Sequence, residues 1–229
     1  MLVHAPRSRI RSPGAERARK AYAARVSFSL TRGDLARSTR AVLHRGRTRN
    51  PDVLLVDAPG GPVVVKDFAP RGRLVRTLLG RWLTRREMRA YRRLAGHPSV
   101  PQWVGCVDAL AFAIEYRPGQ RMSRRLAGAV PAGFADRLEA AVREMHARGV
   151  VHLDLRHRSN VLVDAQGQPV LIDFASAILV PTRGPLARVA RTLLGRFDRV
   201  AVEKWRQRVE PGGIDGSASG APRGASRPM

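Results

Sequence analysis

Hydrophobic positions in the N-terminal half form short β-rich runs followed by a long helical stretch. The runs "RAVLHRG", "DVLLVDA" and "GPVVVKDF" are rich in β-branched residues, and the turn "DAPGG" joins the last two into an expected hairpin. In residues 74–94 the apolar positions fall near helical spacing, and Gly96 can end that helix. A further apolar run, "ALAFAIEY", predicts another strand that stops at Pro118 and Gly119. We therefore expect a small antiparallel sheet with one helix.

The C-terminal half has a different pattern, which predicts helices and one small hairpin. The stretch "GFADRLEAAVREMHARG" places Leu138, Val142 and Met145 on one face, as an amphipathic helix requires. Residues 160–174 contain two short apolar runs around the turn "DAQGQP", which predicts a second hairpin. The stretch "PLARVARTLLGRFDRVAVEKWRQR" predicts a final helix or helix pair. The expected fold class is α+β. Trp82, Trp103 and Trp205 are expected to pack in the core or between its parts.

Composition narrows the class of protein only slightly. The 229 residues carry a formal net charge of +24, and all but three of the 42 basic residues are arginine. This charge permits a nucleic-acid or anionic-membrane partner, but a biased amino-acid usage explains it equally well. The single cysteine, Cys106, excludes an internal disulfide framework and a cysteine-ligated metal site. With no long apolar run and no secretory signal, we expect a cytoplasmic protein.

Both ends of the chain differ in composition from the middle. Residues 1–25 are Arg-rich and nearly free of acids, which predicts a disordered basic arm, with an organelle transit peptide as the alternative. Residues 209–229 have the Gly/Ser/Pro composition of a disordered tail. The hexapeptide "RTLLGR" occurs twice, at 76–81 and 191–196. We interpret it as a shared helix-surface pattern; the alternative is a basic amphipathic face that contacts anionic lipid at the inner membrane.

Five polar residues occur in an order that suits phosphoryl transfer. That chemistry needs a cation on the triphosphate, oxygen ligands for Mg²⁺ and a carboxylate near the attacking hydroxyl. Lys66 lies on the expected strand "VVVKDF", and Glu87 lies on the helix that follows as its counter-ion. Asp154 lies in a loop after a helix, and Asn160 and Asp173 lie at the two ends of the small hairpin.

With these residues in place, the sequence resembles a divergent, minimal member of the eukaryotic-like protein kinase superfamily. It is most similar in character to the bacterial lipopolysaccharide-core Kdo/heptose kinases and the RIO-type kinases. The resemblance implies a two-lobed kinase-like fold, with a small antiparallel N-lobe sheet and a truncated helical C-lobe. The kinase-like domain would span residues 26–208, with the N-lobe at about 26–115, the hinge at about 115–119 and the C-lobe at about 120–208.

The resemblance also implies roles in binding ATP. Lys66 would bind the α- and β-phosphates with Glu87 as its ion-pair partner. In "AIEYRPG", Ile114 would be the gatekeeper, and Glu115 and Tyr116 would offer backbone groups to adenine.

The same resemblance assigns the residues of phosphate transfer. Asp154 would act as the base or orient the hydroxyl, Arg156 would contact the γ-phosphate, and Asn160 and Asp173 would bind Mg²⁺. No glycine-rich loop is evident. The turn "HRGRTRNP", with Gly46, is the best candidate for the phosphate-binding loop, and "LTRGDLARST" is a second candidate.

Several departures from the superfamily pattern affect these expectations. Asp154 and Asn160 are six residues apart instead of five, so both keep their places only if the extra residue bulges outward. Leu153 replaces the usual arginine before the catalytic aspartate, which argues against control by activation-loop phosphorylation. Ala175 replaces the glycine of "DFG". The short chain after Asp173 predicts a minimal lower lobe.

Other interpretations stay open. A buried Lys–Glu pair can be purely structural, and His152 is expected to support the loop backbone and take no part in the chemistry. The acceptor is a protein Ser/Thr side chain or an envelope lipopolysaccharide-core sugar. Two rival functions are a pseudokinase that binds nucleotide without turnover, and a RIO-like ribosome- or RNA-associated protein whose nucleic-acid binding depends steeply on salt.

Overall fold

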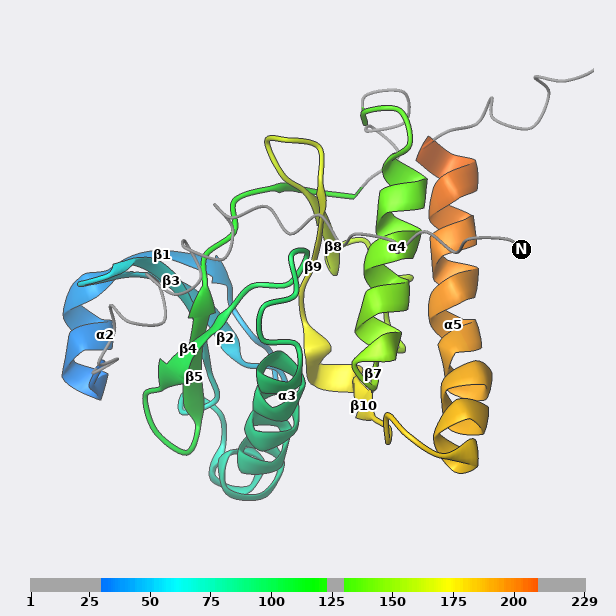
Figure 1. Ribbon diagram of the computed structural model, residues 1–229. Coiled ribbons are helices and arrows are strands. Elements are labelled where there is room, and N and C mark those ends of the chain that lie inside the picture. Colours follow the sequence, from blue (N-terminus) through cyan, green and yellow to red (C-terminus); the bar gives the residue numbers. More distant parts are fainter. Residues whose placement is uncertain (1–29, 123–129, 210–229) are drawn as a thin grey trace, which may run out of the picture.

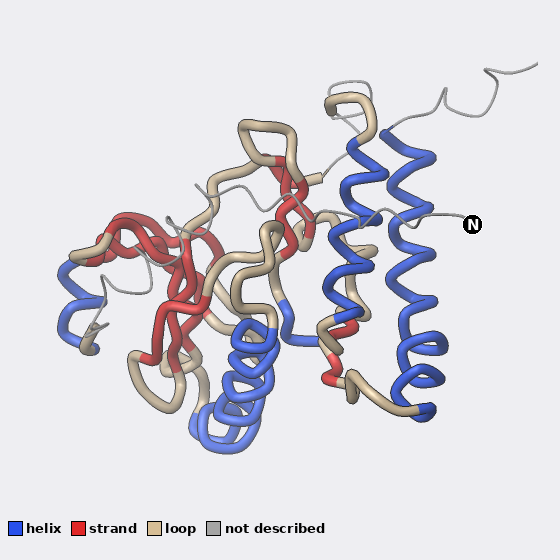
Figure 2. Tube along the Cα trace, in the orientation of Figure 1, coloured by secondary structure: helices blue, strands red, loops and turns tan. Residues whose placement is uncertain are grey.

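The computed structural model describes residues 30–122 and 130–209, and it has the expected α+β architecture (Figure 1). A sheet with one long helix forms the N-terminal part, and two antiparallel helices with two small sheets form the C-terminal part (Figure 2). The expected basic arm at 1–25 lies outside the described residues. So does the expected tail, apart from Val209, which ends the last helix.

Five antiparallel strands form the main sheet in the order β1-β2-β3-β5-β4. Their bounds are Thr39–His44 (β1), Asp52–Ala58 (β2), Gly61–Asp67 (β3), Trp103–Cys106 (β4) and Ala111–Glu115 (β5). The turn "DAPGG" closes the β2–β3 hairpin with Ala58 opposite Gly61, as predicted. Because side chains alternate along a strand, Val63 and Val65 pack into a small cluster on one face, while Val64 packs toward the main core.

Three helical segments accompany this sheet: α2 (Arg32–Ser38), the π-helical η1 (Val75–Gly80) and α3 (Arg81–Arg93). The second candidate for the phosphate-binding loop, "LTRGDLARST", is wrong, because most of it forms α2. Thr31 and Asp34 close a capping box at its start: Asp34 donates its backbone N–H to the Thr31 hydroxyl and accepts from the Thr31 N–H. These bonds satisfy the backbone groups that a phosphate-binding loop would leave free.

The C-terminal part is built around α4 (Phe134–Ala147) and α5 (Pro185–Val209), so the final segment is one helix and not a pair. The expected hairpin is present as β8 (Val161–Val163) and β9 (Pro169–Leu171), with β6 (Gln120–Arg121) added to its edge. The short strands β7 (Val150–Val151) and β10 (Ile178–Leu179) pair before and after the turn η3 (Phe174–Ser176).

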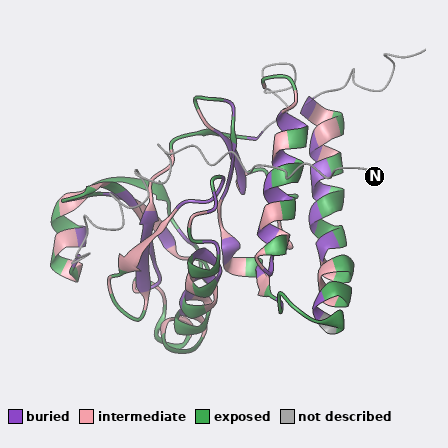
Figure 3. Ribbon diagram, in the orientation of Figure 1, coloured by how far each residue is buried: buried purple, intermediate pink, exposed green. Residues whose placement is uncertain are grey.

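One large hydrophobic core extends across both parts of the molecule (Figure 3). It includes Tyr91 of α3 and Phe112 of β5, together with Phe134, Phe174 and Trp205 from the C-terminal part. The edge of the Tyr91 ring packs on Phe174, with ring centroids 5.0 Å apart. The two parts are therefore joined by shared side-chain packing as well as by the chain.

The tryptophans divide into three environments. Trp205 is fully buried, and Trp103 is half-buried and stacks on Phe112. Trp82 is 54% exposed, so the expectation that it packs inside is wrong. Leu74 and Leu78 of the same helical stretch are also exposed, because no described element covers the outer side of η1 and the start of α3.

Candidate active site

Lys66 joins the two parts of the molecule through two carboxylates. Its Nζ lies 2.6 Å from Oε1 of Glu87 on α3 and 2.7 Å from Oδ1 of Asp173, which follows β9. Lys66 and Glu87 are almost completely buried, whereas 46% of the Asp173 side chain is exposed. Residues separated by up to 107 positions along the chain therefore meet at one ammonium group.

The charges of this cluster shift the pKa values of its members. Burial alone would lower the pKa of Lys66, but Asp173 and Glu87 raise it above its ordinary value. The positive charge of Lys66 holds the pKa of Asp173 below its usual range, against the effect of burial. Burial raises the pKa of Glu87, and the pair with Lys66 opposes that rise. Lys66 and Asp173 are thus charged near neutral pH, as contact with phosphate and metal requires.

Asp173 has a left-handed backbone conformation, with φ 65° and ψ 70°. A non-glycine residue in this region is uncommon and is held there by its surroundings. Its backbone N–H donates to the buried Tyr91 hydroxyl at 3.3 Å, and the next residue, Phe174, is fully buried. This arrangement points the Asp173 carboxylate toward Lys66 and solvent.

Asp154 and Asn160 remain in contact despite the extra residue between them. The Asn160 amide Nδ2 donates to the backbone oxygen and to Oδ2 of Asp154, both at 2.9 Å. Between them Leu155 is buried, while Arg156, His157 and Arg158 are exposed. Most of the loop between them is therefore at the surface, while Asp154 and Asn160 stay within hydrogen-bond distance of each other.

Asn160 and Asp173 lie at the open end of the β8–β9 hairpin. The N–H of Ile172 donates to the Asn160 backbone oxygen at 3.0 Å, which continues the ladder by one residue beyond Val161 and Leu171. The hairpin thus places the amide and the carboxylate on neighbouring strands at the same end.

A buried carboxylate on α5, which the sequence analysis missed, anchors this loop. Asp198 accepts hydrogen bonds from the backbone N–H groups of His152 and Leu153, each at 2.8 Å, and from Nε2 of His146 at 2.8 Å. Trp205, further along the same helix, donates its Nε1–H to the Leu155 oxygen at 2.9 Å. The only sequence signal was an acid at helical spacing from Ala201, Val202 and Trp205 on an apolar face.

His152 supports the loop backbone, as its structural interpretation predicted. Its Nδ1 accepts from the Asp154 N–H at 3.3 Å, which leaves Nε2 to donate to the Ile172 oxygen at 3.0 Å. Burial lowers the pKa of this imidazole. A neutral ring suits both bonds and links the loop to the strand that leads to Asp173.

The β1–β2 turn carries Gly46 in a position that only glycine fits. A Cβ there would lie 2.1 Å from the Asn50 oxygen. The Gly46 N–H donates to Asp52 Oδ1 at 2.8 Å, and Arg71 donates to both the Gly46 oxygen and Asp52. In the β2–β3 register Val53 is opposite Lys66, so the turn leaves the sheet beside Lys66. Three arginines on the turn are exposed: Arg45, Arg47 and Arg49.

The expected hinge residues lie where the chain leaves the main sheet. Ile114 is buried on β5, opposite Val64 of β3. Glu115 ends β5, and its carboxylate accepts from the Gln102 N–H at 3.0 Å. Tyr116 is half-buried and begins the connection of residues 116–119 to β6.

Arg156 lies outside the charge cluster of Lys66, Glu87 and Asp173. It is exposed, and no other described residue forms a hydrogen bond or ion pair with its guanidinium. The pKa of Lys204 on α5 is lowered by slight burial and by the positive charges of Arg208 and Arg156. Arg156 therefore lies near other cations.

The donor set fits Mg²⁺ by its chemistry. Mg²⁺ is commonly held by one or two protein oxygen ligands together with substrate phosphates, not by a cage made of protein alone. Asp173 is half-exposed and forms its one ion pair within the described chain through Oδ1, while its carboxyl group also accepts from the Ala175 backbone. The Asn160 Oδ1 accepts from the Ser159 hydroxyl at 3.1 Å. Within 30–122 and 130–209, no cluster of three or more His, Cys, Asp or Glu side chains can hold a metal. These residues therefore suit a metal that arrives with a phosphate ligand.

Comparison with solved structures identifies the fold as protein-kinase-like. No family model matches this sequence, and neither does any curated protein. The chain is similar to the Rio2 kinase from Chaetomium thermophilum, with a TM-score of 0.55 and 17% sequence identity over 82% of this chain and 62% of that chain. A complex of Rio2 kinase from the same organism with ADP, Mg²⁺ and phosphoaspartate gives a TM-score of 0.54 and 19% identity, covering 82% and 65%. The chain thus spans less than two thirds of either kinase.

Proposed function

We propose that this protein is an ATP- and Mg²⁺-dependent phosphotransferase that moves the γ-phosphate to a hydroxyl acceptor. The observation that carries the proposal is the meeting of Lys66, Glu87 and Asp173 at one buried ammonium. A purely structural ion pair does not need a second, half-exposed carboxylate held in a strained backbone conformation. The ADP and Mg²⁺ in the Rio2 complex support nucleotide and metal binding by a protein of this fold.

Each residue has a defined task in this proposal. Lys66, oriented by Glu87, binds the α- and β-phosphates, and Asn160 and Asp173 hold Mg²⁺. When bound, Mg²⁺ neutralises charge on the phosphate oxygens. Asp154 orients the acceptor hydroxyl and takes its proton, and the Asn160 amide holds the Asp154 carboxylate in place through its 2.9 Å bond.

Nucleotide binding involves further residues, which lie on the main sheet and at its end. Ile114 lies behind the adenine, and Glu115 and Tyr116 bind it in a hinge at residues 115–119, between an N-lobe at 26–115 and a C-lobe at 120–208. The turn around Gly46 covers the phosphates. Because this turn has one glycine in place of several, its exposed arginines supply cations where backbone N–H groups are lacking. Arg156 is available to reach the γ-phosphate, because it has no carboxylate partner among the described residues.

The acceptor is a protein Ser/Thr side chain or a lipopolysaccharide-core sugar. After Asp173 the described chain contains only η3, β10 and α5. Few elements are therefore available to hold an extended peptide, which favours a compact acceptor.

Mg²⁺-dependent ATP turnover tests the proposal. Purified wild type is compared with Asp154→Ala and Asp173→Ala, each with lipopolysaccharide core and with a generic protein as acceptor. The matched control is Asp57→Ala, which removes an exposed carboxylate paired with Arg40. We expect turnover in the wild type and the control and its loss in both site variants. Because the Rio2 complex contains phosphoaspartate, the protein itself is also assayed for hydroxylamine-labile phosphate.

Two results would replace the proposal with one of its rivals. ATP binding without turnover under any condition would make the protein a pseudokinase. Salt-dependent RNA binding without ATP binding would make it an RNA-associated protein.

A further inference from the structure

Large hydrophobic side chains are exposed on two helical segments of the molecule. On η1 and α3 they are Leu74, Leu78 and Trp82, which are 73%, 67% and 54% exposed. On α5 they are Val189, Leu193, Phe197 and Val200, each more than half exposed. Each set contains three residues at the i, i+4, i+8 spacing of one helical face, and Val200 follows at i+11. With Leu179 they make up eight of the ten large exposed hydrophobic residues in the described chain.

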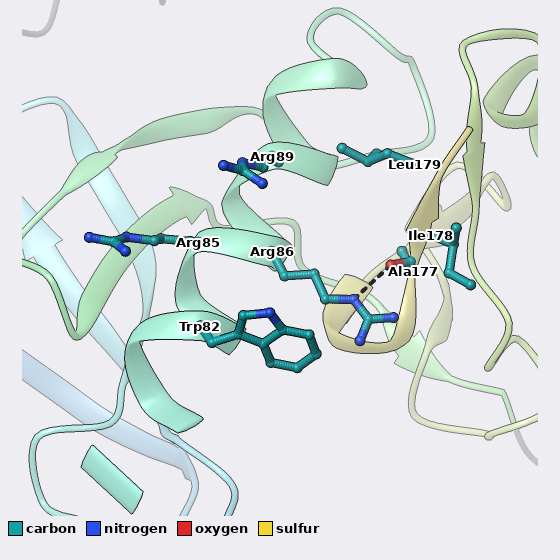
Figure 4. A pocket seen from close by; sticks show the side chains of 7 residues that line it. All are labelled: Trp82, Arg85, Arg86, Arg89, Ala177, Ile178 and Leu179. Carbon is teal, nitrogen blue, oxygen red and sulfur yellow. Dashed lines mark hydrogen bonds between the residues drawn. The ribbon is translucent and has the colours of Figure 1, made fainter. Parts of the chain in front are cut away.

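The helical segments that carry these residues begin at the same edge of the fold. In Figure 1 the beginnings of α3 and of α5 lie at the lower edge of the view, with β10 between them. Trp82 of α3 and Leu179 of β10 line one open cavity of about 420 Å³, shown in Figure 4. Only the short connection 180–184, exposed apart from the buried Val180, separates β10 from α5. We call this surface, formed by residues 74–89 and 178–200, the basic apolar edge.

The exposed charge of the basic apolar edge is positive. Residues 74–89 and residues 178–200 each contain five arginines and one acid. The two acids, Glu87 and Asp198, are buried and bonded within the site. Around Trp82, Arg85 and Arg89 are exposed without a carboxylate partner in the described chain. An occupant of this edge must therefore be both apolar and anionic.

The repeated hexapeptide contributes the same arrangement twice. In each copy the first leucine is exposed, as Leu78 and as Leu193. In each copy the glycine lies close against the core: a Cβ added at Gly80 would come within 3.0 Å of Phe68, and one added at Gly195 within 3.0 Å of His146. The glycine brings the helix close to the core, and the leucine and flanking arginines face outward.

We propose that the basic apolar edge binds the surface of an anionic lipid bilayer. Arginines that flank leucine, phenylalanine and tryptophan on one helical face fit a boundary between phosphate headgroups and acyl chains. Arg86 stiffens the centre of this surface, since it lies 5.1 Å from the Trp82 ring and donates to the Ala177 and Ser176 oxygens at 2.9 and 2.8 Å (Figure 4). None of the helices in 30–122 and 130–209 combines the length and apolarity needed to cross a bilayer. The inference is therefore one of peripheral binding.

This inference does not depend on phosphotransfer. Lipid binding by the edge requires neither ATP nor Asp154. If both proposals hold, α3 carries Glu87 on its inner face and lipid contacts on its outer face, so the site is held close to acceptors embedded in the envelope.

Vesicle sedimentation tests the proposal. The full chain is mixed with phosphatidylcholine vesicles with or without phosphatidylglycerol, at low and high salt. We expect binding only to the anionic vesicles and weaker binding at high salt. Arg85→Glu and Arg89→Glu should each weaken binding roughly fivefold or more, since one cation near an anionic surface contributes about that factor. Leu193→Ser with Phe197→Ser should weaken it at least about tenfold.

Matched variants away from the edge serve as controls. Val42→Ser with Leu43→Ser replaces two exposed apolar residues of β1, and Arg121→Glu reverses an exposed charge on β6. Both should bind vesicles like the wild type. Trp82 also reports on the orientation, because it is the most exposed tryptophan: brominated lipid should quench its emission, and Trp82→Phe should lose that quenching.

Three outcomes would overturn the proposal. The first is equal binding to neutral and anionic vesicles, or none. The second is loss of binding in the β1 and β6 controls to the same extent as in the edge variants. The third is self-association that the edge variants abolish, without vesicle binding, which would make the edge an interface between copies of the chain.

Discussion

On the sheet side of the candidate site, ion pairs hold the functional side chains in place. On the loop side, hydrogen bonds to backbone groups hold the loop that carries Asp154. Lys66, Glu87 and Asp173 hold one another through ion pairs at 2.6 and 2.7 Å. The loop that carries Asp154 is instead held by Asp198 and Trp205 of α5, which bond its N–H and C=O groups. We therefore expect that the charge cluster can be replaced by apolar residues with little loss of stability, whereas loss of the backbone contacts destabilises the loop.

The two kinds of contact separate residues that serve the chemistry from residues that serve the structure. A buried ion pair contributes little net stability compared with well-packed apolar residues, so stability alone does not explain Lys66 and Glu87. A buried carboxylate that satisfies two otherwise unpaired N–H groups stabilises the loop, because each buried N–H left unpaired would cost free energy.

The largest expected effect is on the charge cluster. Lys66→Met should reduce phosphotransfer by about 10³-fold, because it removes the cation on the phosphates. It should also destabilise the fold by about 3 kcal/mol, because Glu87 is left buried without a partner. In the double variant Lys66→Met/Glu87→Leu, urea denaturation should show that stability returns, whereas ATP turnover should show that activity does not. Activity recovered together with stability would show that the pair is only structural.

The next effect concerns the anchor of the loop. Asp198→Ala should lower the free energy of unfolding by about 3 kcal/mol, because it leaves the N–H groups of His152 and Leu153 unpaired in the interior. Asp57→Ala, which breaks an exposed pair, should change it by less than about 1 kcal/mol. Urea denaturation measures both. Equal effects of the two variants would remove the distinction between the two sides of the site.

A smaller effect depends on pH. Burial lowers the pKa of His152, so below about pH 6.5 the unfolded chain takes up a proton that the folded imidazole resists. The stabilising contribution is thus present above about pH 6.5 and is lost as the pH falls. In urea denaturation as a function of pH, the free energy of unfolding of His152→Gln should fall less at acid pH than that of the wild type. The control, His44→Gln at an exposed position, should match the wild type.

The smallest effect isolates a single hydrogen bond. Trp205→Phe keeps the ring in the core but removes the donor to the Leu155 oxygen, which should cost about 1 to 2 kcal/mol. Trp103→Phe, at a half-buried ring that stacks on Phe112, is the comparison. Hydrogen exchange of the loop amides should rise only in Trp205→Phe. If hydrogen exchange of these amides did not change in Trp205→Phe, Asp198 alone would account for the anchoring of the loop.

Local patterns in the sequence were sufficient for much of the fold. Short β-rich apolar runs bounded by turn residues predicted β2, β3 and β5, and the pattern of apolar positions predicted α4 and α5. The order of Lys66, Glu87, Asp154, Asn160 and Asp173 was also enough to suggest the site, since the resemblance rests on residue types at given spacings.

The remaining features depend on contacts between segments that are distant in the sequence. Asp198 became the anchor of the loop because α5 packs beside residues 152–155, a contact between segments 45 and 46 positions apart in the chain. Trp82 was expected to pack inside, yet it is exposed because no other described element covers that face of α3. A sequence records which side chains are apolar; whether an apolar face is buried depends on the distant segments that pack against it.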